Sequence, residues 1–160
     1  MRMRNIVTAV LCLVTLCGGG APSRADCEDA IAEHMVGEAL LAAHLVAVAE
    51  KLGMKQTEIN GVLKRVAENS AIKEFWITDS SGHAYLTNTG IDFTFSADST
   101  KQPQASEFWP LLDGRQKIVI QKARKREIDD RVFKYVGVAG LDKPRIVQVG
   151  VEGQSLANCK

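Results

Sequence analysis

Apolar side chains recur at helical spacing in two stretches that follow the first 25 residues. Residues 28–52 are rich in Ala and Leu, begin with acidic residues and end before Gly53, a residue type that is common at helix C-termini. Residues 57–69 place apolar side chains three and four positions apart, with Thr57 as a suitable N-cap. The pattern therefore predicts two helices, one long and one shorter.

The longer helix is expected to be apolar on more than one side. Within residues 39–49, His44 is the only polar side chain. These eleven residues are too few to cross a bilayer as a helix, and a helix that is apolar all round needs cover on two faces. We expect one face to pack on the sheet of the same chain. The other face is expected to pack on a second helix, either from this chain or from a partner protomer.

Beyond residue 70 the pattern changes to that of strands. Five strands are expected, at residues 74–78, 83–87, 115–127, 132–139 and 145–151. The first two form a hairpin around a turn at 79–82, and a polar insertion at 88–104 leads into a short helix at 106–112. This order predicts an α+β fold, in which the long N-terminal helix packs on a roughly five-stranded antiparallel sheet.

The first 25 residues have the features of an export signal. Arg2 and Arg4 precede a mostly apolar stretch at 6–17, and glycines and a proline follow it. Small residues then occupy the −3 and −1 positions of a cut before Asp26. We expect cleavage near this position, with an uncleaved N-terminal anchor as the alternative.

Cleavage there would leave residues 26–160 as a single exported domain, periplasmic or secreted, of 135 residues out of 160. The formal charge would change from +1 to −2, because three arginines are lost with residues 1–25. The one dense basic stretch, at 117–126, is followed at once by acidic residues. The charge pattern therefore does not favour nucleic-acid binding, which needs a clustered basic surface.

Two cysteines would remain, Cys27 and Cys159, next to the two ends of the exported domain. Exported chains meet an oxidising compartment, so we expect a disulfide bond between these two residues. Free or intermolecular thiols are the alternative.

Patterns for catalysis and metal binding are weak. His34 and Glu38 are one helical turn apart, but two residues do not complete a coordination sphere. The sequence has no Cys-x-x-Cys-His motif for haem and no Gly-x-Ser-x-Gly nucleophile elbow. We therefore expect a protein that is not an enzyme and that uses no metal or cofactor. We expect His44 to be a core histidine bonded to a carbonyl group.

Two stretches resemble a known family. The stretch "EFWITDSSGHAYLTN" is a strand, an Asp-x-x-Gly turn and a strand, and "FKYVGVAGLDKPRIVQVG" ends the expected sheet. Together with the long helix they resemble the single Cache domain, the extracytoplasmic PAS-like sensor module of bacterial chemoreceptors and sensor kinases, over residues 28–153. The resemblance implies a PAS-like sheet and a pocket for a small metabolite, of the amino-acid or organic-acid class.

A receptor of that family continues into a membrane helix and a signalling domain, whereas this chain continues only a few residues beyond Val151. The expectation is therefore a free-standing exported sensory domain. It would act on a membrane receptor or sensor kinase in signal transduction or chemotaxis.

The implied pocket lies between the last strands and the insertion. The expected ligand-binding residues are Trp76, Phe95, Trp109, Arg126, Lys134, Tyr135 and Gly137. The aromatic residues would form walls, Gly137 would leave room above the sheet, and Arg126 would hold a carboxylate through two parallel hydrogen bonds. Two alternatives stay open: the aromatic rings fill the core, and Arg126 pairs with an acidic residue of the adjacent turn.

A second function is compatible with the same sequence. The protein would be a ligand-free interaction protein that forms a homodimer through its apolar N-terminal helix, with a pocket filled by its own aromatic residues. Residues such as Leu41 and Leu45 would then form the working surface.

Overall fold

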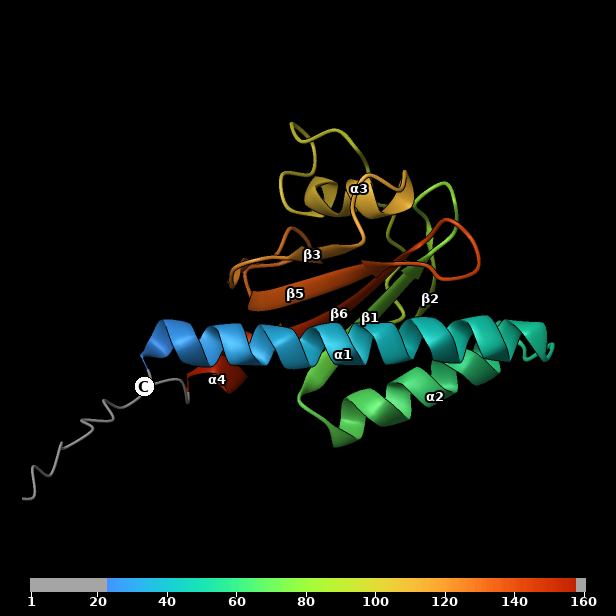
Figure 1. The fold of residues 1–160 in the computed structure, drawn as a ribbon, viewed down its shortest axis with the longest axis horizontal. Coiled ribbons are helices and arrows are strands. Elements are labelled where there is room, and N and C mark those ends of the chain that lie inside the picture. Colours follow the sequence, from blue (N-terminus) through green and yellow to red (C-terminus); the bar gives the residue numbers. More distant parts are fainter. Residues whose placement is uncertain (1–22, 158–160) are drawn as a thin grey trace, which may run out of the picture.

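A helix of 28 residues, α1 (Arg24–Lys51), runs along one face of an antiparallel sheet (Figure 1). The computed structural model describes residues 23–157. Its architecture confirms the expected α+β fold, with the long N-terminal helix packed on the sheet. The sheet has six strands rather than about five.

The strands follow the order β2-β1-β6-β5-β3, and β4 also pairs with β5. Their bounds are β1 Ile72–Thr78, β2 Ala84–Thr87, β3 Ile118–Ile120, β4 Arg124–Lys125, β5 Val132–Ala139 and β6 Ile146–Glu152. The prediction of one long strand at 115–127 was wrong, because the chain leaves the ladder between β3 and β4. The side chain of Gln121 is buried there and donates from Nε2 to the backbone oxygen of Gln104, at 2.8 Å.

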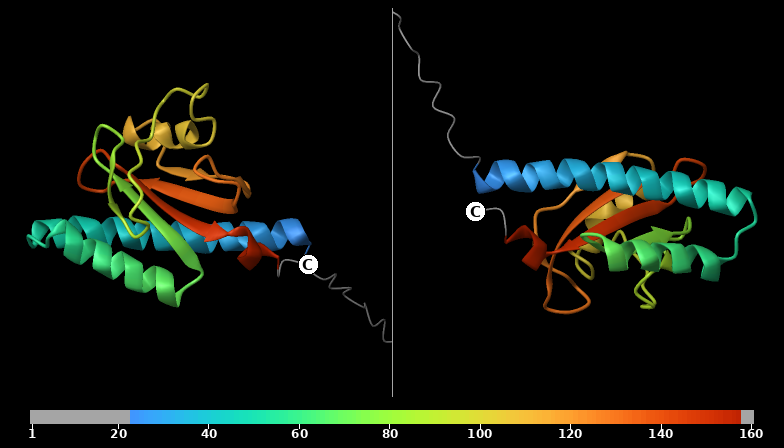
Figure 2. Two further views of the ribbon diagram at one scale, coloured as in Figure 1. Left: turned by 180° about the vertical axis from the view of Figure 1, so that it is seen from behind. Right: turned by 90° about the horizontal axis from the view of Figure 1, so that it is seen from below.

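Helices cover both faces of the sheet (Figures 1 and 2). Helix α1 and helix α2 (Gln56–Asn69) lie on one face. A short 3-10 helix, η1 (Ala105–Phe108), and α3 (Trp109–Leu112) lie on the other face, at the end of the insertion. A final turn of helix, α4 (Gly153–Leu156), follows β6 and lies near the first turns of α1.

The start of α2 differs from the expectation. Its N-cap is Lys55 rather than Thr57, because the carboxylate of Glu58 accepts a hydrogen bond from the backbone nitrogen of Lys55 at 2.7 Å. An acidic residue in the first turn satisfies a helix N-terminus in this way.

Side-chain alternation along the strands produces two separate cores. On β5, Val136 and Val138 belong to the core beneath α1 and α2, whereas Phe133 and Tyr135 belong to the core beneath η1 and α3. Trp76 of β1 also faces the η1–α3 side. The strands are therefore buried on both faces, in the way that a three-layer arrangement requires.

The first turn of α1 overlaps the expected signal cleavage site. Ser23 is the N-cap, and its hydroxyl accepts a hydrogen bond from the backbone nitrogen of Asp26 at 3.2 Å. A cut before Asp26 would therefore remove the cap of α1. Residues 1–22, which hold most of the expected signal, lie outside the described residues.

Of the two cysteines of the expected disulfide bond, only Cys27 lies among the described residues. Cys27, in the first turns of α1, takes part in a disulfide bond. Cys159 lies outside the described residues, so the pairing of Cys27 with Cys159 stays a prediction.

Helix α1 is apolar over more than the uninterrupted run of residues 39–49. By length and composition alone, Ala25–Lys51 is able to cross a membrane, and about a third of its most apolar stretch is buried in the fold. An apolar N-terminal helix of this kind could be a signal sequence or a membrane span. The same composition occurs in the core helix of a globular domain.

The C-terminal end of α1 is fixed to the sheet by a group of charges. The carboxylate of Glu50 accepts hydrogen bonds from Arg145 Nη2 at 2.7 Å, from Lys143 Nζ at 2.8 Å and from the hydroxyl of Tyr85. Arg145 is buried and also reaches Asp142 at 2.9 Å. Burial opposes the ionisation of Glu50, but the hydrogen bonds from Arg145, Lys143 and Tyr85 outweigh it and lower the pKa of Glu50 to about 2.

This pKa predicts a loss of stability in acid. The unfolded chain takes up a proton near the ordinary pKa of 4.5, whereas the folded chain keeps Glu50 ionised down to about pH 2. The stabilisation is therefore complete above pH 4.5 and is lost as the pH falls through 2. We expect Glu50→Gln to lower the free energy of unfolding by about 2 kcal/mol at pH 7, because a charged hydrogen-bond acceptor is lost.

Urea unfolding at pH 7, 4.5 and 2.5 checks this expectation. The deficit of Glu50→Gln relative to the wild type should shrink at the lowest pH. Glu68→Gln, at an exposed carboxylate of α2, should match the wild type throughout. An equal deficit for Glu50→Gln at all three pH values would contradict the role of the Glu50 charge.

Candidate functional site

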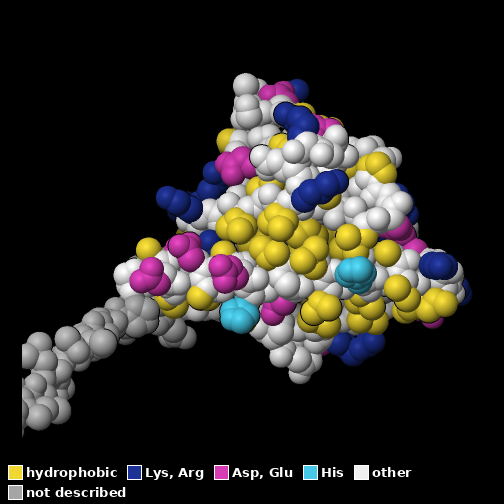
Figure 3. Space-filling model, viewed as in Figure 1, with side chains coloured by type: hydrophobic (Ala, Val, Ile, Leu, Met, Phe, Trp, Pro, Cys, Tyr) yellow, Lys and Arg dark blue, Asp and Glu magenta, His cyan; other side chains and the backbone are white. Residues whose placement is uncertain are grey.

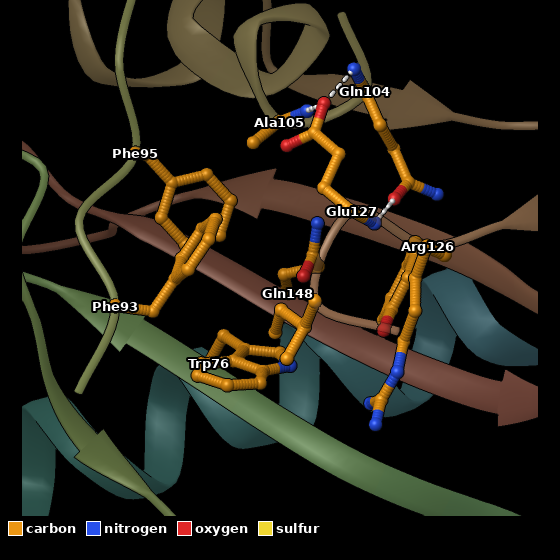
Figure 4. A pocket seen from close by; sticks show the side chains of 10 residues that line it. Trp76, Phe93, Phe95, Gln104, Ala105, Arg126, Glu127 and Gln148 are labelled. Carbon is orange, nitrogen blue, oxygen red and sulfur yellow. Dashed lines mark hydrogen bonds between the residues drawn. The ribbon is translucent and has the colours of Figure 1, made fainter. Parts of the chain in front are cut away.

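A small hollow lies between the sheet and the insertion (Figure 4). Phe93 and Phe95 stand on one side, Arg126 and Glu127 stand on the other, and Trp76 with its neighbours forms the floor. The cavity volume is about 30 Å³. This is room for about one or two water molecules, and is well below the several hundred Å³ of an ordinary ligand pocket.

The structure brings together four of the seven expected site residues. Trp76, Phe95, Arg126 and Tyr135 all line the hollow. The rings near it pack on one another edge to face, with centroids 5.7 Å apart for Trp76 and Phe93 and 5.1 Å apart for Phe93 and Phe95. This packing agrees with the alternative that the aromatic residues fill the core.

The other three expected residues do not line the hollow. A Cβ atom on Gly137 would lie 2.7 Å from Phe108 and 2.8 Å from Leu111, so side chains of this chain fill the room above that glycine. Lys134 lies on the opposite face of β5, and its Nζ donates to the backbone oxygen of Gln121 at 3.1 Å. Trp109 packs against the hairpin turn at 79–82, where its ring would lie 2.9 Å from a Cβ atom on the turn glycine.

A buried carboxylate, Glu74 of β1, organises the floor of the hollow. Its Oε2 accepts hydrogen bonds from the hydroxyl of Tyr135 at 2.7 Å and from Trp76 Nε1 at 3.0 Å. Its Oε1 accepts from Arg126 Nη1. Burial and the Glu74 carboxylate raise the pKa of Tyr135, so the phenol stays protonated and donates.

Sequence reasoning did not assign Glu74 a role. The available signal was an acidic residue directly before the apolar run at 75–77, because a buried acid has to be paired.

Arg126 already has carboxylate partners within the chain. Its guanidinium is 1% exposed, lies 4.8 Å from the ring centroid of Phe133, and donates to Asp129 at 2.7 and 2.5 Å as well as to Glu74. The hydrogen bonds to Asp129 raise the pKa of Arg126, and the same bonds lower the pKa of Asp129. The alternative expectation of a solvent-facing Arg126 paired with the adjacent turn is right about the partner, Asp129, and wrong about the exposure, because the arginine is buried.

One polar group of the hollow lacks such a partner, because Nε2 of Gln104 is buried and has no hydrogen-bond partner among the described residues. The amide of Gln148, on β6, points into the hollow in Figure 4 and is 4% exposed. Glu127 differs, since its Oε1 accepts hydrogen bonds from the backbone nitrogens of Gln104 and Ala105 and so fixes the start of η1.

A larger apolar groove lies on the other side of the molecule, between α1, α2 and β1. Its volume is about 300 Å³, and its walls include Leu41, Leu45, Leu63, Val66 and Phe75. Figure 3 shows hydrophobic side chains gathered over α1 and beside it. The groove is therefore lined mainly by apolar side chains, and Leu41 and Val66 in its walls are themselves exposed.

The expectation that His44 is a core residue was wrong. His44 is exposed, because α1 turns its Met35–Ala39–Val46 side toward the sheet and its His44 side toward solvent. The neighbours of His44 one turn away, Leu40 and Val48, are exposed as well.

No family model matches this chain, and no curated protein matches it. The resemblance to the Cache domain therefore stays a prediction. Among residues 23–157, no three His, Cys, Asp or Glu side chains gather in a way that would hold a metal ion.

The paired charges of the hollow predict a strong coupling between Glu74 and Arg126. Removing one member of a buried ion pair leaves the other charge uncompensated, so we expect Arg126→Met to destabilise the fold by about 3 kcal/mol. The double variant Glu74→Met/Arg126→Met should lose less than the sum of the two single variants. Urea unfolding of the four proteins measures the coupling.

Lys125→Met is the matched control, because Lys125 is an exposed neighbour whose partner Asp130 is also exposed. It should cost less than about 1 kcal/mol. Additive losses in the double variant would show that Glu74 and Arg126 do not act as a pair.

Proposed function

We propose that the protein is an exported interaction domain that works by self-association through the exposed apolar face of α1. This face is formed by Leu40, Leu41, Leu45, Val48 and Leu52. Leu41 is 70% exposed and Leu52 is 75% exposed. These exposed side chains are the single observation that carries the proposal, because an isolated domain gains nothing from large apolar side chains in water.

The geometry favours a partner on this face over a ligand in the hollow. The groove beside Leu41 and Leu45 has a volume of about 300 Å³, whereas the hollow beside Gln148 has about 30 Å³. Gly137, which was expected to leave room for a ligand, accommodates the ring of Phe108 instead, and Gly150 of the neighbouring strand accommodates the ring of Tyr135.

Export is part of the proposal. It is supported by the basic and apolar pattern of residues 1–25 and by the disulfide bond at Cys27, since disulfide bonds persist in oxidising compartments. In that compartment the domain would act on a membrane receptor or sensor kinase.

Self-association is tested by analytical ultracentrifugation of the wild type and of Leu41→Glu. We expect a dimer for the wild type and a monomer for Leu41→Glu, with an unchanged circular dichroism spectrum. The new carboxylate would be buried in the dimer interface without an opposite charge beside it, and its desolvation would be too costly. Ile128→Glu is the matched control, since Ile128 is exposed on the opposite face of the sheet. It should remain dimeric.

A wild type that stays monomeric at every concentration would overturn this function. Binding of the monomeric wild type to lipid vesicles, abolished by Leu41→Glu, would assign the apolar face to a membrane instead.

A second candidate function is binding of a small ligand in the hollow, and the buried, unpartnered Nε2 of Gln104 and the amide of Gln148 that points into the hollow favour it. The expected ligand class, an amino acid or organic acid, would have to compete with Asp129 for Arg126. Asp129 is the more exposed of the two carboxylates on this arginine, so its side chain is the one that a ligand could displace.

A thermal-shift screen against amino acids and organic acids tests this candidate. A ligand present at one hundred times its dissociation constant should stabilise the wild type by about 2.7 kcal/mol. Gln148→Leu should remove the shift, whereas Lys101→Ala, in the exposed part of the insertion, should keep it. A screen with no shift would leave the hollow as a structural core.

A further inference from the structure

The exposed side of α1 contains a glycine that nothing within the protomer explains. Gly37 lies in the middle of the helix, and a Cβ atom there would meet nothing within 4 Å. A glycine inside a helix lowers helix stability relative to alanine. A residue without a side chain lets another backbone or a bulky side chain approach the helix closely.

Gly37 and His44 lie on the same side of α1. They are seven residues apart, which is about two turns, so their positions follow one another along the helix. His44 is exposed and stands between Leu40 and Val48, which are one turn before and after it. A helix that covers this side would meet the imidazole ring, and a residue without a side chain opposite the ring would leave room for it.

Charges at the two ends of α1 are of opposite sign. Asp29 and Glu33 lie in the turns before Gly37, and Lys51 and Lys55 lie at and beyond the C-terminal end; all four are exposed. Figure 3 shows acidic side chains over the start of α1 and basic side chains near its other end. A parallel pair of these helices would place like charges together, whereas an antiparallel pair places acidic residues beside basic ones.

We propose that two copies associate through antiparallel α1 helices that cross beside Leu40 and Leu41, with Gly37 of each copy facing His44 of the other. In this register Glu33 of each copy lies within one turn of Lys51 of the second copy. The inference rests on the proposed self-association and adds its orientation and register.

A size swap tests the contact between Gly37 and His44. Gly37→Leu should weaken the dimer at least tenfold, because the new side chain meets the histidine of the second copy. The fold of the protomer should keep its stability, since the space around Gly37 is open. His44→Ala in the same chain should restore dimer formation, because the smaller side chain at position 44 makes space for the new leucine of the second copy.

A charge swap tests the orientation. Glu33→Lys and Lys51→Glu should each weaken the dimer about tenfold, as new like-charge contacts form at two symmetric places. The double variant Glu33→Lys/Lys51→Glu should recover to near the wild-type dissociation constant. Asp92→Lys makes the same change of charge on the exposed insertion and should have no effect.

Sedimentation equilibrium of the full chain measures all of these dissociation constants. A dimer that is sensitive to Leu41→Glu, but in which neither double variant is rescued, would overturn the antiparallel register and leave the self-association standing. A monomeric wild type would overturn both.

Discussion

The structure depends on how α1 is covered. Apolar side chains surround this helix, and each one that stays in water forgoes the free energy of burial. The side of Met35, Ala39 and Val46 is buried beneath the sheet. The side of Leu41 and Leu52 meets no cover among the described residues. The fold therefore buries one face of α1 and leaves the other face exposed, which is the face that the proposed self-association would cover.

The opposite layer of the molecule needs no such partner. Glu74 binds Arg126, Tyr135 and Trp76 at once, and Arg126 also binds Asp129. A buried ion pair is costly to desolvate and is retained only where both charges have good partners. These contacts fix the turn between β4 and β5 over the aromatic core, and the volume left beside them is about 30 Å³. The contrast between this closed layer and the open side of α1 supports docking over ligand binding.

The sequence was sufficient for the order and type of most elements, because the period of apolar positions is a local property. The burial of a side chain and the rotation of a helix about its axis are not local properties, because they depend on contacts with distant parts of the chain. The strand expected at 115–127 is interrupted after Ile120, where the buried side chain of Gln121 bonds Gln104, a residue 17 positions away. His44 was expected in the core because its neighbours are apolar, but the helix rotation that exposes it is set by the sheet beneath Val46. Glu74 was missed because its partner Arg126 is 52 positions away.

Three glycines show why the type of a residue does not reveal what occupies the space beside it. Gly137 and Gly150 lie in strands, and the rings of Phe108 and Tyr135 fill the space that each one leaves. Gly37 lies on a helix, and the space beside it is open. A filled space accounts for a glycine through packing inside the protomer. The open space beside Gly37, flanked by exposed apolar side chains, has no such account within the protomer, and the antiparallel helix of the proposed second copy would supply one.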